Sequence, residues 1–294
     1  MTRRFEADLK RIERQLDKIC ASYVGQLSVE VADAIRYGLK SPGKRVRPLL
    51  FLFAYRAAGG TRDASLLACA PEVIHAYSLM HDDLPCMDDD DMRRGRPTVH
   101  KVYGSRTAIL GGVAMIPLAA RVVRESAREL ELAPDATAAI VETLLVAAGM
   151  SGMIGGQLRD LAGEGLSLSL DDREAIHSAK TGALIVGSVR MGALAAGASK
   201  EKIAALESYG TSIGLAFQIM DDVLDVTSTT GALGKTAGRD AVLGKSTYPA
   251  LLGVEGARER AQSLIDDAMG ALKRRRLLTQ ELSQVANFML TRTS

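Results

Sequence analysis

Apolar residues near the start of the chain recur at the spacing of one face of an α-helix. Phe5, Leu9, Ile12, Leu16 and Ile19 are separated by four, three, four and three positions. This spacing follows the helical period rather than the two-residue period of a strand. The chain is therefore predicted to open with a helix.

Later segments carry signals for the start of further helices. Pro71 opens "PEVIHAYSLMHDD", Pro134 and Asp135 precede "ATAAIVETLLVAAG", and Ser169 with Asp172 resembles a capping box before "REAIHSAKTGALIVGSVRMGAL". Only "TVHKVYG" shows a short alternation of strand type, and no two such runs flank a hairpin turn. With no repeat period and no Ser/Pro-rich linker, we expect an all-α fold and one helical domain over residues 1–294.

Composition and charge narrow the class of protein. The 294 residues are 47% hydrophobic with a net charge of +2, which suits a globular chain and gives no reason to expect nucleic acid as a partner. Three cysteines without CxxC spacing indicate reduced thiols and a cytoplasmic location. The charged N-terminus lacks a signal peptide, and the run "TAILGGVAMIPLAA" is expected to be too short and too rich in Gly and Pro to span a bilayer.

The stretch "HDDLPCMDDDDMRRG" places six aspartates within ten positions, followed by two arginines. At an effective dielectric near 20 and roughly 6 Å separation, each carboxylate pair repels by about 3 kcal/mol. One interpretation is a solvated acidic loop neutralised by its neighbours, and the other is a cluster that requires multivalent cations.

Helical geometry constrains this cluster. If the helix from Pro71 continues to Asp83, His75 and Asp82 share one face. Asp88 does not fit that helix. The segment "LPCM" must therefore bulge or turn for Asp88 to join Asp82 and Asp83.

A second acidic group lies in "FQIMDDVLD". Gln218, Asp221, Asp222 and Asp225 fall within roughly 100° of one another on a helix, which is either an ordinary polar face or a ligand face. Mg²⁺ takes oxygen ligands and often uses only one or two carboxylates together with substrate phosphates. Two such groups in one chain suggest several Mg²⁺ ions that hold a diphosphate.

Compact basic groups accompany the acids, in "GKRVRP", "RRGRP", "AKTGA" and "LGKTAGRDAVLGKSTYP". Arginine suits bidentate phosphate contacts, and lysine acts as a point charge. Together with the acids, these groups describe a site for two anionic substrates, one held through metal and the other held directly.

These residues carry a resemblance to a known family. From "YGLKSPGKRVRP" to the C-terminus, with "DDLPCMDDDDMRRGRPT", "GLAFQIMDDVLD" and "LGKSTYPALLG", the chain resembles the trans-prenyltransferases of the polyprenyl diphosphate synthase family, and among them the bacterial farnesyl diphosphate synthases. The resemblance implies a helical bundle around a deep central cavity, usually in a homodimer, with the two Asp motifs facing each other across its mouth.

The resemblance also implies a role for each motif position. Asp82, Asp88 and Asp83 would bind two Mg²⁺, and Asp221, with Asp222 and Asp225, a third. The allylic diphosphate would contact Arg93, Lys180, Thr181, Gln218 and Lys235. Isopentenyl diphosphate would contact Lys44, Arg47, His75 and Arg94, and Lys245 would add positive charge. The catalytic set is then Asp82, Asp83, Asp88, Lys180 and Asp221.

In this family the allylic C–O bond ionises, the isopentenyl double bond attacks the cation, and the released diphosphate takes the proton, so no protein nucleophile is needed. A large residue five positions before the first Asp limits the product, here Tyr77 with Ser78 beside it, which favours C15 farnesyl diphosphate. Geranylgeranyl diphosphate synthase is the main alternative, because "DDLPCMD" occurs in that group too. Two departures from the family pattern are Pro42 before "GKR" and Val113 where relatives have Asp.

Other classes fit less well. A terpene cyclase would not need "GKRVRP" or a second "DDVLD". A non-catalytic subunit of a heteromeric prenyl synthase usually lacks the Asp motifs, and a plain acidic metal-binding module leaves the basic groups unexplained. The role of three further residues is left with two alternatives, since they either tune the acidic cluster or are simply solvated: Asp89, Asp90 and Asp91.

Overall fold

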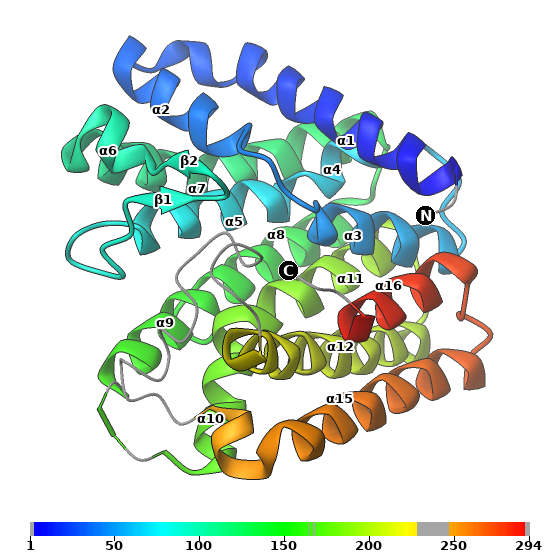
Figure 1. The fold of residues 1–294 in the computed structure, drawn as a ribbon. Helices are drawn as coiled ribbons and strands as arrows, with labels where there is room; N and C mark the ends of the chain where they lie inside the picture. The colour runs from blue at the N-terminus through cyan, green and yellow to red at the C-terminus, as the bar shows by residue number, and fades with distance from the viewer. Residues whose placement is uncertain (1–2, 164, 167, 228–246, 292–294) are drawn as a thin grey trace. The chain divides into compact units, whose positions relative to one another are not determined.

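The computed structural model describes residues 3–163, 165–166, 168–227 and 247–291, and within them the chain is almost entirely helical (Figure 1). This confirms the predicted all-α class. The contacts divide the chain into two compact units, Met1–Leu52 with Thr61–Leu144 (unit 1) and Phe53–Gly60 with Leu145–Ser294 (unit 2). Each unit is described by itself, and the expectation of one domain over 1–294 stays a prediction.

Unit 1 contains short and medium helices and one long helix, and two further helices begin in unit 1 and end in unit 2. Its elements are α1 (Arg3–Ser22), η1 (Val24–Gln26), α2 (Val29–Leu39), the first part of α3 (Val46–Ala57), α4 (Ser65–Ala68), α5 (Ala70–Asp82), β1 (Met92–Arg93), β2 (Arg96–Pro97), α6 (Val99–Tyr103), α7 (Ser105–Glu129) and most of α8 (Pro134–Ala148). Helix α5 packs along α7, and this packing fixes the end of α5 from which the acidic loop begins.

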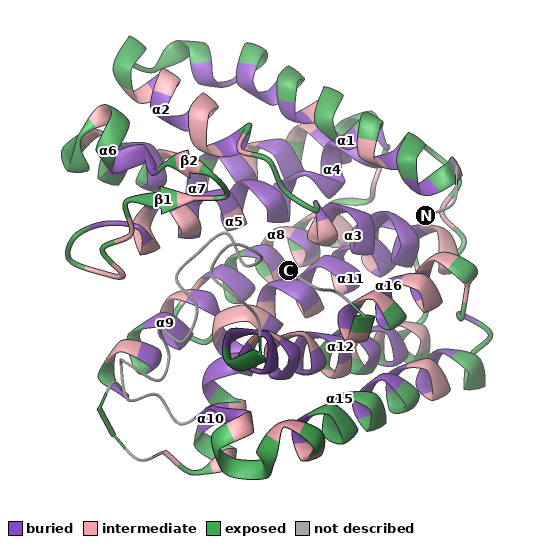
Figure 2. Cartoon of the chain, viewed as in Figure 1, coloured by how far each residue is buried: buried purple, intermediate pink, exposed green. Residues whose placement is uncertain are grey.

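The predicted first helix is confirmed as α1. Ile12, Leu16 and Ile19 are fully or almost fully buried, and the opposite face of the helix is exposed (Figure 2). The apolar stripe read from the sequence is therefore the face that packs on the core of unit 1.

Unit 2 consists of α9 (Met153–Ala162), α10 (Leu170–His177), η2 (Ser178–Gly182), α11 (Ala183–Ala195), α12 (Lys200–Thr227), α15 (Tyr248–Arg274) and α16 (Gln280–Thr291). The long helices α12 and α15 pack side by side (Figure 1). Helix α10 begins as predicted: the Ser169 hydroxyl accepts a hydrogen bond from the Asp172 amide at 3.1 Å in a complete capping box.

Two local elements could not be foreseen from the pattern of residues. "TVHKVYG", the one segment with a strand-type alternation, forms α6, and the two strands of the described residues, β1 and β2, pair as a hairpin that the sequence analysis did not predict. Arg94 and Gly95 connect them with φ of 53° and 75°. Two successive residues with positive φ give the tight turn whose twist matches paired strands.

The apolar run "TAILGGVAMIPLAA" was expected to be too short to span a bilayer, and that expectation is wrong about the length of the helix that contains it. It lies inside the 25-residue helix α7, where a side chain at Gly112 would meet the His81 ring, so this glycine allows α5 and α7 to approach closely. By length and composition alone, Ser105–Glu129 and Pro134–Ala162 could each span a membrane, and 39% of the most apolar window of each is buried. Core helices of soluble proteins pass the same test.

Candidate active site

The acidic loop of unit 1 begins at the last residue of α5. The Asp88 amide donates to the Asp82 carbonyl at 2.8 Å, and the Met87 amide donates to the Leu84 carbonyl at 2.9 Å. The chain thus folds back on the end of the helix, which confirms that "LPCM" turns. Both Asp82 and Asp88 are partly exposed, and their backbones are adjacent.

In the hairpin after this loop, the adjacent arginines Arg93 and Arg94 have different partners. The Arg93 Nε donates to Asp83 Oδ1 at 2.6 Å, and Asp83 is buried. Arg94 donates from Nη1 to the Pro42 carbonyl at 2.6 Å. A Cβ at Gly43 would lie 2.5 Å from Arg94 Nη1, so a side chain there would displace the end of this guanidinium. Since proline keeps its carbonyl, the Pro42 departure leaves this contact intact.

A basic group lies beside α5 and the start of α3. Burial lowers the pKa of Arg47 to about 10, since the charged form loses hydration. Burial, followed by the positive charges of Arg47 and Arg94, holds the pKa of His75 well below its usual range, so its imidazole is neutral near pH 7. Lys44 precedes this group in the loop and is exposed.

Arg45, which the sequence analysis did not single out, holds that loop in place. It is buried, and its guanidinium pairs with Glu13 at 2.7 Å and Glu72 at 2.9 Å and donates to the Ser41 carbonyl. Its φ is 49°, an uncommon conformation that these contacts maintain. Because it lies between Lys44 and Arg47, it fixes the segment that carries both.

In unit 2, helix α12 carries the second acidic group. All four predicted residues lie in it, and Gln218 Nε2 donates to Asp221 Oδ2 at 3.3 Å. Asp222 and Asp225 are buried, and Asp222 accepts a hydrogen bond from the Tyr248 amide at 3.0 Å. Buried carboxylates need such donors or a cation to offset their lost hydration.

Lys180 and Thr181 lie in η2, a single π-helical turn between α10 and α11. π-helical turns are rare in proteins, and those that occur are often found at functional sites. Lys180 Nζ pairs with Asp160 Oδ2 at 2.7 Å, and Arg173 pairs with the other oxygen at 3.2 Å. Asp160, on α9, is 7% exposed. The sequence analysis missed it, because a lone aspartate in "GGQLRDLA" has no local signal of a distant lysine partner.

The chain-length residues lie inside unit 1. Tyr77 is buried and packs edge-on against His81, with ring centroids 5.0 Å apart, and the Ser78 hydroxyl donates to the His75 carbonyl. His81 in turn contacts the Ile109 carbonyl of α7 at 3.1 Å. Tyr77 thus packs against a neighbour on α5, and that neighbour contacts α7. Lys235 and Lys245, the remaining predicted substrate contacts, lie outside the described residues.

The predicted metal ligands fit a hard divalent cation by the chemistry of their donor set. Asp82, Asp88, Asp221 and the buried pair Asp222 and Asp225 offer only carboxylate oxygens. Oxygen ligands of this kind suit Mg²⁺, whereas soft metals select thiolates.

Comparison with known proteins assigns this arrangement of helices and acidic groups to a family. The Polyprenyl synthetase family model matches residues 28–285, and the chain belongs to this family of metal-dependent prenyltransferases. It is therefore an enzyme.

Three relatives show how close the similarity is. The chain is 44% identical to Escherichia coli (strain K12) farnesyl diphosphate synthase over 292 residues, covering 98% of this chain and 97% of the relative. It is 43% identical to the chloroplastic geranylgeranyl pyrophosphate synthase of Catharanthus roseus over 246 residues, covering 83% and 68%. A solved structure of a geranyltransferase from Helicobacter pylori, complexed with magnesium and isoprenyl diphosphate, has a TM-score of 0.81 at 30% identity, covering 99% and 97%.

Proposed function

We propose that this enzyme condenses isopentenyl diphosphate with dimethylallyl or geranyl diphosphate to give farnesyl diphosphate and release diphosphate. Geranylgeranyl diphosphate synthase is the alternative product assignment. The high identity to a farnesyl diphosphate synthase over almost the whole of both chains favours the C15 product.

One observation carries the division into two substrate sites. On a single hairpin, Arg93 pairs with the acidic end of α5, and Arg94 pairs with the loop that carries Lys44. We assign the first arginine to an allylic diphosphate that is bound through metal. We assign the second, with Arg47 and His75, to isopentenyl diphosphate bound directly.

The acidic groups of the two units are the proposed ligands of about three Mg²⁺ ions. Each Mg²⁺ usually takes one or two carboxylates from a protein, and the number of aspartates in these groups agrees with that. When bound, these ions neutralise the departing diphosphate and so promote cleavage of the allylic C–O bond. Asp82, Asp88 and Asp221 are the proposed principal ligands. Asp83 has two proposed roles: it holds Arg93 through an ion pair, and it contributes to the binding of metal.

The basic side chains supply fixed charge that does not depend on metal. Lys180, oriented by Asp160, places an ammonium group against the allylic diphosphate, and Thr181 and Gln218 donate hydrogen bonds to it. The neutral His75 donates an N–H to isopentenyl diphosphate, while Arg47 and Arg94 supply the charge. Lys235 and Lys245 complete the proposed set.

We also propose a homodimer and a cytoplasmic location without stable membrane insertion. On α7, Ile109, Leu110 and Val113 are 42%, 50% and 54% exposed. A run of exposed apolar side chains on one helix is typical of a protein interface. Val113 enlarges that apolar face, at a position where the family resemblance implies Asp. Light scattering of a Val113→Asp variant tests this interface. A variant that stays dimeric would contradict a role for α7 in the dimer interface.

The metal-ligand assignment is tested by Asp82→Ala and Asp221→Ala. Each should lower turnover by about 10²- to 10³-fold or more, because one charge-stabilising group of the transition state is lost. Far-UV circular dichroism should remain that of the wild type. Near-normal turnover in both variants would contradict the metal roles. Turnover of an allylic diphosphate in the absence of isopentenyl diphosphate would instead indicate a terpene cyclase.

A further inference from the structure

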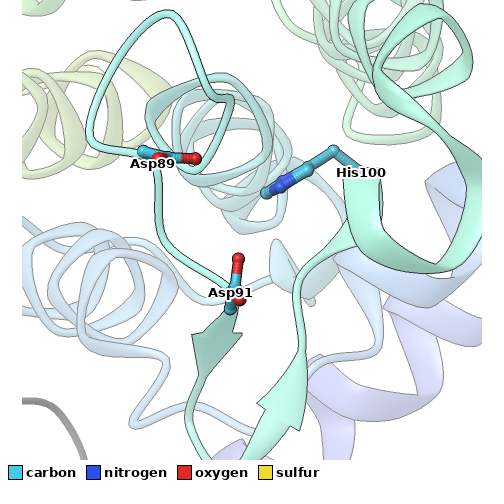
Figure 3. A group of neighbouring side chains, drawn as sticks. All are labelled: Asp89, Asp91 and His100. Atoms are coloured by element: carbon cyan, nitrogen blue, oxygen red, sulfur yellow. The ribbon is translucent and has the colours of Figure 1, made fainter.

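Three side chains of unit 1 converge outside the proposed substrate contacts. One potential ligand atom from each of Asp89, Asp91 and His100 lies within 4.8 Å of the others (Figure 3). The two aspartates belong to the loop between α5 and β1, and His100 belongs to α6. Figure 3 shows the imidazole directed toward the space beside the two carboxylates. Acidic groups alone are common at surfaces, so the histidine decides whether this cluster is a site.

The hydrogen bonds of His100 leave one ring nitrogen as an acceptor. The Thr98 hydroxyl donates its proton to the Asp91 carbonyl at 3.3 Å, so toward the His100 Nδ1, 3.1 Å away, it acts as acceptor. In this hydrogen-bond arrangement Nδ1 donates to the Thr98 oxygen, and the lone pair of the ring is on Nε2. His100 is 6% exposed, and its buried Nε2 has no hydrogen-bond partner. A buried lone pair without a donor is costly unless something binds it.

This arrangement is the one that metal-binding histidines use. A ligating histidine commonly donates its second ring N–H to a neighbouring oxygen, which fixes the tautomer and the orientation of the ring. Thr98 plays that part here, and it is buried. The Asp91 carbonyl fixes Thr98 further, by accepting from its amide at 3.0 Å.

The two carboxylates are free to adjust around an ion. Both aspartates are exposed, and the backbone of Asp89 is held at φ 50°, with its amide bonded to the Leu84 carbonyl. One oxygen of Asp91 pairs with Lys101 at 2.7 Å, which leaves its second oxygen for a ligand bond. Rotation of the exposed side chains is enough to bring three ligand atoms to about 2 Å from a shared ion.

We propose that Asp89, Asp91 and His100 form a separate binding site for a first-row divalent transition-metal ion such as Zn²⁺ or Mn²⁺. One imidazole and two carboxylates suit these ions better than Mg²⁺, which prefers oxygen alone. The ion would join the loop that carries Asp88 to α6. It gives the last aspartates of the acidic run a role apart from the substrate diphosphates.

The experiment measures binding of Zn²⁺ alone by isothermal titration calorimetry, in full-length protein carrying Asp82→Ala and Asp221→Ala to weaken the substrate-metal ligands. On this background, Asp89→Asn should lower Zn²⁺ affinity at least tenfold. Asn keeps the shape of the side chain and tolerates positive φ, so the fold should be retained. Asp90→Asn, which removes the same charge from the neighbouring position, should leave affinity within twofold. Equal affinities in the two variants, or no Zn²⁺ binding at all, would overturn the proposal.

A spectroscopic readout identifies the histidine. With Mn²⁺ bound to the same background protein, electron spin-echo modulation should show coupling to a directly bound imidazole nitrogen, and His100→Gln should abolish it. Coupling that persists in His100→Gln, or is absent from the background protein, would overturn the assignment. Because neither experiment measures turnover, failure here leaves the proposed prenyltransferase reaction standing, and loss of that reaction leaves this site standing.

Discussion

The ammonium group of Lys180 lies 2.7 Å from a carboxylate oxygen of Asp160, a buried residue twenty positions earlier in the chain. Arg173 holds the other oxygen of the same carboxylate at 3.2 Å. A lysine side chain has four rotatable bonds, so without such a partner its charge would be spread over many positions. The pair fixes the position of the ammonium group of the lysine.

Asp160→Asn should therefore impair turnover without removing any group that contacts substrate. We expect kcat to fall by about 10²-fold, since small misplacements of catalytic groups have effects of this size. Steady-state kinetics with both substrates measures it. Asp171→Asn, at an exposed position on α10, is the matched control and should retain wild-type kcat. Equal kcat in the two variants would remove Asp160 as the residue that positions Lys180.

Gly156→Ala should disturb the same region through the backbone. A Cβ at this position would lie 2.2 Å from the Lys180 amide nitrogen and 2.5 Å from its Cα, so η2 must move. We expect the free energy of unfolding to fall by about 1–3 kcal/mol, with a loss of activity. Denaturant unfolding measures the first quantity. Gly25→Ala is the control, because no atom lies within 4 Å of its new methyl group.

Tyr77→Ala should lengthen the product beyond C15, because it removes the buried ring that we propose limits the growing chain. Product sizing after incubation with labelled isopentenyl diphosphate checks this. Tyr77→Phe keeps the ring and should give the wild-type product. If the alanine variant folds and still stops at C15, Tyr77 does not set product length.

The depressed pKa of His75 predicts a pH dependence of stability. In the native state the imidazole resists protonation, whereas in the unfolded chain its pKa is near 6.5. The unfolded state thus binds more protons below pH 6.5, and the free energy of unfolding falls as the pH is lowered through that value. Between pH 6.5 and 5 the contribution is at most about 2 kcal/mol.

Denaturant unfolding of the wild type and His75→Gln at pH 7.5 and pH 5 isolates the contribution of His75 to the free energy of unfolding. The wild type should lose more stability than the variant over that interval. An identical loss in both would mean that His75 titrates normally in the folded protein.

The parts of the site that could be predicted are those that depend on local sequence. The helix expected to begin near Pro71 is confirmed as α5, and the turn that brings Asp88 back to Asp82 followed from Pro85 and from helical geometry. The helical face of Gln218 and Asp221 also depends only on spacing, and it is confirmed in α12.

What could not be predicted depends on contacts between distant positions. The hairpin turn at Arg94 and Gly95 lacks the usual Asn-Gly or Asp-Gly signal, and Arg94 is held by the Pro42 carbonyl, far away in sequence. The π-helical turn at Lys180 depends on packing against α9. The partnership of Asp160 with Lys180 needs the tertiary fold, since neither residue has a local feature that indicates the other.

The central claim is tested most directly by sizing the product of one reaction. Purified protein is incubated with Mg²⁺, labelled isopentenyl diphosphate and, separately, the C5, C10 and C15 allylic diphosphates. We predict that the C5 and C10 starters give labelled farnesyl diphosphate, and that omission of Mg²⁺ abolishes the product. Labelled C20 product as the main species would favour a geranylgeranyl diphosphate synthase, and no labelled product with any starter would contradict the proposed reaction.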